Sequence, residues 1–113
     1  MIPKLIMLIG VSGAGKSTFA KHLKDAGEID LIISSDALRA ELFGDENEQN
    51  HNNELFNELH NRIRKALKEG KRVCYDATNL SSKRRIGFLK SVSDLDIVKE
   101  VFFFLFRYCV DIQ

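Results

Sequence analysis

KLIMLIGVSGAGKST, residues 4–18, decides how this chain folds. Residues 5–9 are apolar without polar alternation, which predicts that residues 4–9 form a strand buried on both faces of a sheet. An amphipathic helix is predicted from residue 16 to about residue 25. The turn that joins them consists of small residues, Ser12, Gly13, Ala14 and Gly15. Small residues let the backbone wrap closely around an anion, so this strand, turn and helix predict a phosphate-binding loop.

The spacing Gly-x-x-x-x-Gly-Lys-Ser, from Gly10 to Ser17, adds chemistry to this loop. Lys16 supplies a positive charge for the β- and γ-phosphates, and the hydroxyl of Ser17 is a hard oxygen ligand for Mg²⁺. A plain glycine-rich turn with a solvated lysine is disfavoured, because strand, turn and helix agree. We predict that ATP and Mg²⁺ bind through Gly10, Ser12, Gly13, Ala14, Gly15, Lys16, Ser17 and Thr18.

The bulk composition is that of one small domain covering residues 1–113, with 44% hydrophobic residues. The net charge of +1 excludes a scaffold that binds nucleic acid by charge alone, yet it permits a local basic pocket. The apolar runs are shorter than a membrane span, so we expect a cytoplasmic protein without membrane contact. Cys74 and Cys109 match no metal or redox spacing and are predicted to be buried.

The rest of the chain alternates short apolar runs with longer amphipathic stretches. Strands are predicted at residues 31–34, at 72–75 and within 97–106, and helices at about 36–43, 53–69 and 81–92. Polar residues 45–53 are expected to form a surface loop. This alternation predicts an α/β fold, a three-layer doubly wound parallel sheet of about four strands with right-handed crossovers.

The helix at residues 53–69 carries an apolar stripe that we assign to the core. Its members are Phe56, Leu59, Ile63, Ala66 and Leu67. The histidines follow no pattern typical of metal ligands or of a catalytic triad. We therefore expect His22, His51 and His60 on the surface.

Ligands of open parallel sheets bind beyond the carboxyl ends of the strands. The second predicted strand is followed by Asp36 and Arg39, and the third by Asp76, Thr78 and Asn79. Two aspartates and an arginine are thus expected to face the bound triphosphate.

Three motifs together carry a resemblance to a known family. They are the glycine-rich loop, Ser-Asp-x-x-Arg at residues 35–39, and Asp-Ala-Thr-Asn at residues 76–79, with Lys83, Arg84 and Arg85 behind it. Over residues 4–106 the chain resembles the kinase domain of phage-type polynucleotide 5′-kinases and related AAA-type P-loop kinases. The resemblance implies a P-loop NTPase fold and ATP-dependent phosphoryl transfer to an acceptor hydroxyl, with a polynucleotide 5′-OH as the preferred acceptor.

The resemblance also implies roles for individual residues. Asp36 would be the general base for the acceptor hydroxyl, and Arg39, one helical turn on, would bind a phosphate of the acceptor. Asp76 would hold Mg²⁺ through a water or orient Arg39, with Thr78 and Asn79 supporting the acceptor pocket.

Simpler interpretations stand beside these roles. Asp36 is also a good helix N-cap, which would leave Arg39 an ordinary first-turn surface residue. Asp76 and Asn79 are typical of a strand-end turn. Arg84 and Arg85 either face phosphate or form a solvated helix start.

The family normally continues into an arginine-bearing lid after the fourth strand. This chain ends at Gln113, and Arg107 is its only arginine beyond that strand. We therefore expect a missing or truncated lid, which leaves full activity open. Phe102, Phe103, Phe104 and Phe106 need cover on both faces of the strand, so we expect either self-association through the C-terminal strand or a chain that is a fragment.

Three functions remain open on sequence grounds. The leading one is a kinase for a polynucleotide 5′ end. The second is a kinase of the same fold for a small hydroxyl-bearing substrate. The third is a nucleotide-binding module with little catalysis. A GTPase is disfavoured, because the sequence lacks a guanine-reading Asn-Lys-x-Asp.

Overall fold

The computed structural model of the chain describes residues 2–10, 15–45, 50–78, 81–105 and 108–112. Its elements, in chain order, are β1 (Lys4–Gly10), α1 (Lys16–Asp25), β2 (Leu31–Ser34), α2 (Ser35–Phe43), α3 (Asn52–Lys68), β3 (Arg72–Thr78), α4 (Ser82–Ser91), β4 (Val98–Leu105) and β5 (Tyr108–Ile112). The order of strands and helices through β4 is the one the sequence predicted.

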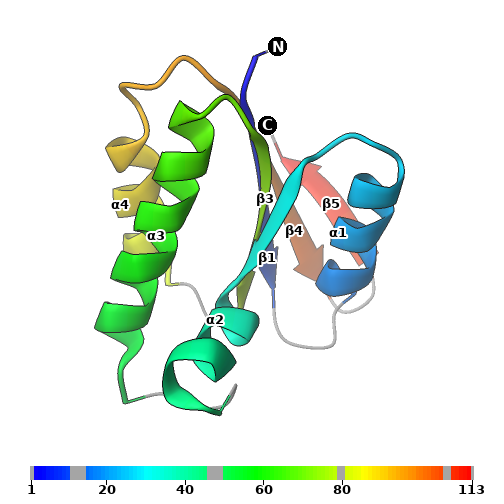
Figure 1. The fold of residues 1–113 in the computed structure, drawn as a ribbon. Coiled ribbons are helices and arrows are strands. Elements are labelled where there is room, and N and C mark those ends of the chain that lie inside the picture. The colour runs from blue at the N-terminus through cyan, green and yellow to red at the C-terminus, as the bar shows by residue number, and fades with distance from the viewer. Residues whose placement is uncertain (1, 11–14, 46–49, 79–80, 106–107, 113) are drawn as a thin grey trace.

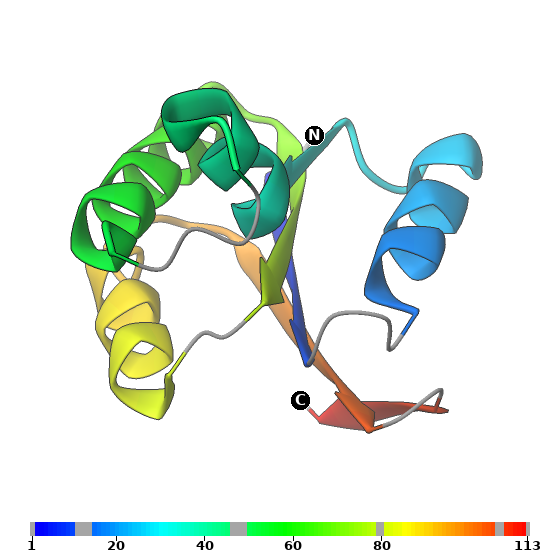
Figure 2. The ribbon, with the colours of Figure 1, turned by 90° about the horizontal axis from the view of Figure 1, so that it is seen from below.

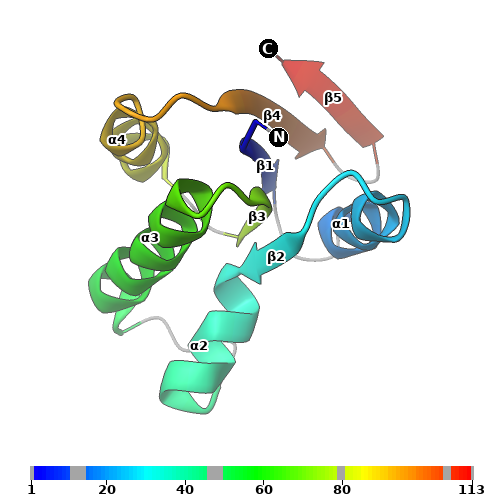
Figure 3. The same ribbon diagram turned by 45° about the horizontal axis from the view of Figure 1, so that its top comes forward.

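The strands form one sheet in the order β2-β3-β1-β4-β5, with β2 and β5 at its edges (Figure 3). The first four strands are parallel, as predicted, and β1 lies in the middle between β3 and β4. β5 pairs with β4 in the antiparallel direction. The sequence analysis did not predict β5, because residues 108–112 carry no boundary signal that separates them from the preceding apolar run.

The helices cover the sheet from both sides, as expected for three layers (Figures 1 and 2). α1 covers one face alone, whereas α2, α3 and α4 lie on the other. Successive side chains of β1 point to opposite faces of the sheet and contribute to two hydrophobic clusters. Leu5 and Met7 belong to the cluster beneath α3 and α4, and Ile6 and Leu8 belong to the cluster beneath α1. The carboxyl ends of the parallel strands therefore lie between two packed layers.

The apolar stripe of α3 is buried, as predicted. His60 on the same helix contradicts the expectation of a surface residue. Its imidazole is half-buried, stacks on the ring of Phe88 at 4.4 Å, and its Nε2 lies 2.9 Å from the hydroxyl of Tyr75. Burial, helped by the charge of Arg84, lowers the pKa of His60 to about 4.

The aromatic rings of β4 receive cover from the helices on both sides. Phe19 of α1 lies 5.3 Å from the ring of Phe102 and 5.5 Å from that of Phe104. The guanidinium of Arg85 sits 5.0 Å from the ring of Phe103. These three rings are thus covered at least in part within one chain, and self-association stays a prediction; Phe106 lies outside the described residues.

Candidate functional site

The phosphate loop is bounded by two glycines for different reasons. Gly10 ends β1 where the strand runs close to β4: a Cβ there would lie 2.8 Å from the carbonyl oxygen of Phe104. Gly15 precedes α1 with φ of 97°, in the left-handed region that favours glycine. The predicted loop residues Ser12, Gly13 and Ala14 lie outside the described residues. α1 then begins at Lys16, so the positive helix end follows the loop directly.

Lys16 and Ser17 meet Asp76 at the start of α1. The Ser17 hydroxyl donates to Asp76 Oδ2 at 3.1 Å, and Lys16 Nζ lies 3.9 Å from Asp76 Oδ1. Asp76 does not follow β3, as the sequence analysis expected, but lies inside that strand opposite Leu8 of β1. The strand continues through a carboxylate because α1 supplies partners for it.

Burial dominates the electrostatics of this trio. Desolvation lowers the pKa of the Lys16 ammonium, against the opposing effect of the Asp76 carboxylate. Desolvation likewise raises the pKa of Asp76, and Lys16 and Ser17 oppose the rise. The negative charge of Asp36 opposes the lowering of the Lys16 pKa and adds to the raising of the Asp76 pKa, so Asp36 lies close enough to act on both groups.

The donor atoms of this trio fit a hard cation. Asp76 Oδ1 is buried and has no hydrogen-bond partner among the described residues. Beside it stands the Ser17 hydroxyl, so a carboxylate and a hydroxyl oxygen are available together. In the described part of the chain no group of three or more His, Cys, Asp and Glu side chains could hold a metal by itself. Mg²⁺ would therefore depend on phosphate oxygens as further ligands.

Asp36 lies in the first turn of α2 and does not cap that helix. The cap is Ser34, whose Oγ accepts from the backbone N–H of Ala37 at 3.3 Å. The side chain of Asp36 is 32% exposed and accepts from Arg39 Nη1 at 3.1 Å. The simpler interpretation of Asp36 as N-cap is thus wrong, and the predicted position of Arg39 one turn further on the same side is confirmed.

Arg39 is almost completely enclosed, with 1% of its side chain exposed. Its Nη2 donates to the side-chain oxygen of Asn52 at 3.1 Å, and its guanidinium lies 6.0 Å from the ring of Phe56. The Nε atom has no hydrogen-bond partner among the described residues. Arg39 is therefore no solvated surface residue, and its hydrogen bonds to Asp36 and Asn52 orient it.

Arg84 extends this cluster, and sequence reasoning did not find its partners. Its Nη1 donates to the backbone oxygen of Asn52 at 3.3 Å and its Nη2 to the side chain of Asn53 at 2.7 Å. Its guanidinium lies 5.0 Å from the ring of Phe56. The paired asparagines that open the amphipathic helix α3 are the only sequence signal for this arrangement.

The two remaining predicted residues fall at the end of β3. Thr78 is the last residue of the strand and stands in register with Gly10. Asn79 lies outside the described residues. Ser34 of β2 stands in register with Asp76, so β2 ends at the same carboxyl edge of the sheet, where α2 follows with Asp36 and Arg39.

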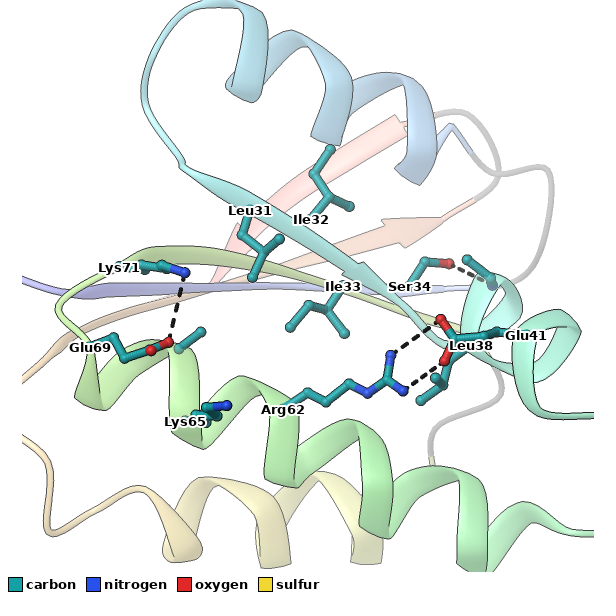
Figure 4. A pocket seen from close by; sticks show the side chains of 12 residues that line it. Leu31, Ile32, Ile33, Ser34, Leu38, Glu41, Arg62, Lys65, Glu69 and Lys71 are labelled. Carbon is teal, nitrogen blue, oxygen red and sulfur yellow. Dashed lines mark hydrogen bonds and ion pairs between the residues drawn. The ribbon is translucent and has the colours of Figure 1, made fainter.

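Two cavities of the described residues lie beside this site without containing Lys16, Asp36, Arg39 or Asp76. One, of about 510 Å³, lies between α3 and α4. The other, of about 370 Å³, lies beside edge strand β2, where Arg62 of α3 reaches Glu41 of α2 at 2.7 Å (Figure 4). No helix in the described ranges is long and apolar enough to cross a membrane.

The fold and the strand-end site define the class of this protein. A parallel sheet with a glycine-bounded loop between β1 and α1, and a lysine and serine at the helix start, is the fold of P-loop kinases. Residues 5–109 match the family model described as an AAA domain, and the chain belongs to that family. Among curated protein sequences, none matches this chain.

Solved structures show the same fold. A chain of the Pnkp1/Rnl/Hen1 complex matches with a TM-score of 0.75 and 25% identity, over 93% of this chain and 35% of that one. A chain of the Pnkp1/Rnl/Hen1 RNA repair complex matches with a TM-score of 0.72 and 26% identity, over 93% and 33%. The Mycobacterium tuberculosis APS kinase CysC, in complex with AMPPNP and APS, matches with a TM-score of 0.71 and 23% identity, over 90% and 62%. This chain thus spans about a third of the length of the first two.

Proposed function

We propose that this chain transfers the γ-phosphoryl group of ATP to an acceptor hydroxyl, with a polynucleotide 5′-OH as the acceptor. The observation that carries the proposal is the Asp36–Arg39 pair, joined at 3.1 Å, at the same sheet edge as the Lys16–Asp76 pair. The Lys16–Asp76 pair suits the donor phosphates, and the Asp36–Arg39 pair suits an acceptor. Phosphoryl transfer requires mainly that two such groups be aligned and their charge neutralised.

On the donor side, Lys16 neutralises the β- and γ-phosphates while the amides at the start of α1 orient them. Ser17 and Asp76 are the residues that would hold Mg²⁺, which polarises the phosphates when bound. Asp76 also fixes Ser17 through their hydrogen bond of 3.1 Å. Because Lys16 is 4% exposed, its charge acts in a poorly solvated setting, where it is stronger than in water.

On the acceptor side, Asp36 accepts the proton of the hydroxyl as its oxygen forms a bond to the γ-phosphorus. The bond between that phosphorus and the β,γ-bridging oxygen breaks, and its electron pair leaves with ADP. Arg39 fixes the carboxylate of Asp36 through its Nη1 and supplies a positive charge beneath the acceptor. A base in this position contributes about 10²–10⁴ in rate.

The comparisons support two different acceptors. Similarity at 26% identity to a chain of an RNA repair complex favours a nucleic-acid end. The likeness in fold to APS kinase keeps a small hydroxyl-bearing substrate as the second candidate. The enclosure of Arg39 supports the third candidate function, a nucleotide-binding module with little catalysis. A buried guanidinium reaches an acceptor phosphate only if the side chains around it rearrange.

The test combines labelled ATP with a 5′-hydroxyl oligonucleotide and, separately, with small hydroxyl-bearing metabolites. Label on the oligonucleotide supports the proposal, label only on a metabolite supports the second candidate, and ATP binding without transfer supports the third. Asp36→Asn should reduce transfer by about 10²–10⁴ while ATP binding is retained, and its melting temperature should fall as well, because the enclosed Arg39 loses its charged partner. Asp96→Asn, at an exposed aspartate, is the matched control. Unchanged turnover in Asp36→Asn would remove Asp36 from the mechanism.

A further inference from the structure

The cavity between α3 and α4 has a lining that none of the roles above uses. It measures about 510 Å³ and follows two helices that both begin at the carboxyl edge of the sheet (Figure 1). From Phe56 to Arg64 it follows α3 over eight residue-to-residue steps, which is about 12 Å at 1.5 Å per step. That length matches about three stacked nucleotides at 3.4 Å each.

The lining contains three aromatic side chains in contact with one another. The rings of His60 and Phe88 stack at 4.4 Å, and those of Phe56 and His60 lie 6.1 Å apart. All three side chains belong to the cavity lining. Phe56 and Phe88 are each only 2% exposed and belong to the core, so the half-buried ring of His60 is the one that a base can reach from the cavity. Stacking on an aromatic ring accepts bases of any identity.

The same lining is cationic. Arg64 and Arg84 contribute two guanidinium groups, Asn57 and Asn61 contribute exposed amides, and no acidic side chain is among the lining residues described. Arg64 also pairs with Asp94 at 2.7 Å, beyond the lining. The cavity beside β2 differs, because Glu41 and Glu69 line it together with its basic residues. A nearly neutral chain thus keeps a local positive groove.

The groove is continuous with the acceptor side of the proposed active site. Arg84, in its lining, donates to the backbone oxygen of Asn52 at 3.3 Å, and Arg39 donates to the side chain of the same asparagine at 3.1 Å. Both guanidinium groups lie over the ring of Phe56, at 5.0 and 6.0 Å. An acceptor whose first hydroxyl stands at Asp36 therefore has the groove as its continuation.

We propose that the groove between α3 and α4 binds the single strand that follows the 5′-terminal nucleotide of the acceptor. This inference rests on the proposed function and adds the place and the chemistry of acceptor binding. Phosphates contact Arg84 and Arg64, the asparagine amides donate to phosphate or sugar oxygens, and a base packs against the half-buried ring of His60. Acceptors long enough to fill the groove bind more tightly than a dinucleotide.

The test uses Asn57→Glu combined with Asn61→Glu, which places two carboxylates in the groove at exposed helix positions. Glutamate has a higher helix propensity than asparagine, so the fold is not endangered. Lys24→Glu makes the same change in net charge on α1, across the sheet, and is the matched control. The probes are 3′-labelled, 5′-hydroxyl oligothymidylates of two, four and eight nucleotides, whose binding is measured by fluorescence anisotropy with a non-hydrolysable ATP analogue.

The expected result is a loss of about tenfold or more in affinity for the eight-nucleotide probe in the double variant, since each lost phosphate contact weakens binding steeply at low salt. The control and the dinucleotide should change less than twofold. Equal affinity of wild type and double variant for the longest probe would refute the proposal that the groove binds the acceptor strand. Transfer of phosphate to the dinucleotide, measured in parallel, separates the two proposals. Transfer that does not depend on acceptor length would support the kinase activity and refute strand binding in the groove. Failure to bind or phosphorylate any oligonucleotide removes the polynucleotide acceptor and the groove with it.

Discussion

Mild acid should destabilise this protein through one residue, His60. Its imidazole is packed against Phe88 and hydrogen-bonded to the Tyr75 hydroxyl, and burial lowers its pKa to about 4. An unfolded histidine has a pKa near 6.5. Between these values the unfolded chain binds a proton that the folded chain does not accept. The stability contributed by neutral His60 is therefore present above about pH 6.5 and is lost as the pH falls toward 4.

The size of this loss follows from the two pKa values. Ideal linkage with 6.5 and 4 gives about 2 kcal/mol between pH 7 and pH 5. His60 is only half-buried, and solvent screening reduces the expected loss to roughly 1 kcal/mol. Asp76 acts in the opposite direction, because its pKa is raised and protonation at lower pH favours its folded form. Its contribution is common to wild type and a His60 variant and cancels in their difference.

Urea denaturation at pH 7, 6 and 5 measures the effect. Wild type should lose roughly 1 kcal/mol more than His60→Gln over this range. His22→Gln, at an exposed histidine of α1, should keep the wild-type pH dependence. The reasoning fails if His60→Gln follows the wild-type curve, or if NMR shows that His60 titrates near pH 6.5 in the folded protein.

Three further predictions concern the site. Asn52→Ala should raise the KM for the acceptor and leave the KM for ATP unchanged in steady-state kinetics, because it removes the partner of Arg39 Nη2. Gly10→Ala should lower the free energy of unfolding by about 1–3 kcal/mol in urea, since its Cβ would meet the Phe104 carbonyl at 2.8 Å. Lys16→Met should weaken ATP binding about 10- to 100-fold by calorimetry, the value of a charged hydrogen bond.

The sequence predicted the parts of the fold that local patterns encode. The apolar run of β1, the helix start at Lys16 and the stripe of α3 all have a period or a boundary that a short window contains. The sequence analysis ended β3 too early, at residue 75, because an aspartate after an apolar run is typical of a turn. Contacts with Lys16 and with Ser17, which is distant by 59 positions, make a buried carboxylate tolerable inside a strand.

Long-range polar contacts also explain why Arg39 and His60 lie deeper in the protein than the sequence indicates. Arg39 was expected to reach outward to an acceptor phosphate, yet Asn52, 13 residues on, helps to hold it inside the protein. His60 was expected on the surface, yet Tyr75, 15 residues on, bonds its ring. Neither partner is marked by spacing or composition, so reasoning from a short stretch of sequence predicts that such polar residues are exposed.

The two halves of the proposed active site are built by different parts of the fold. α1 and β3 hold Lys16, Ser17 and Asp76, while α2 and the start of α3 hold Asp36 and Arg39. Because Arg39 is held by Asn52 in a nearly dry setting, the acceptor half depends on how α3 sits against α2. Changes in α3 should therefore alter acceptor kinetics while ATP binding stays constant, and changes in α1 should do the reverse. This separation makes the donor and acceptor roles testable one at a time.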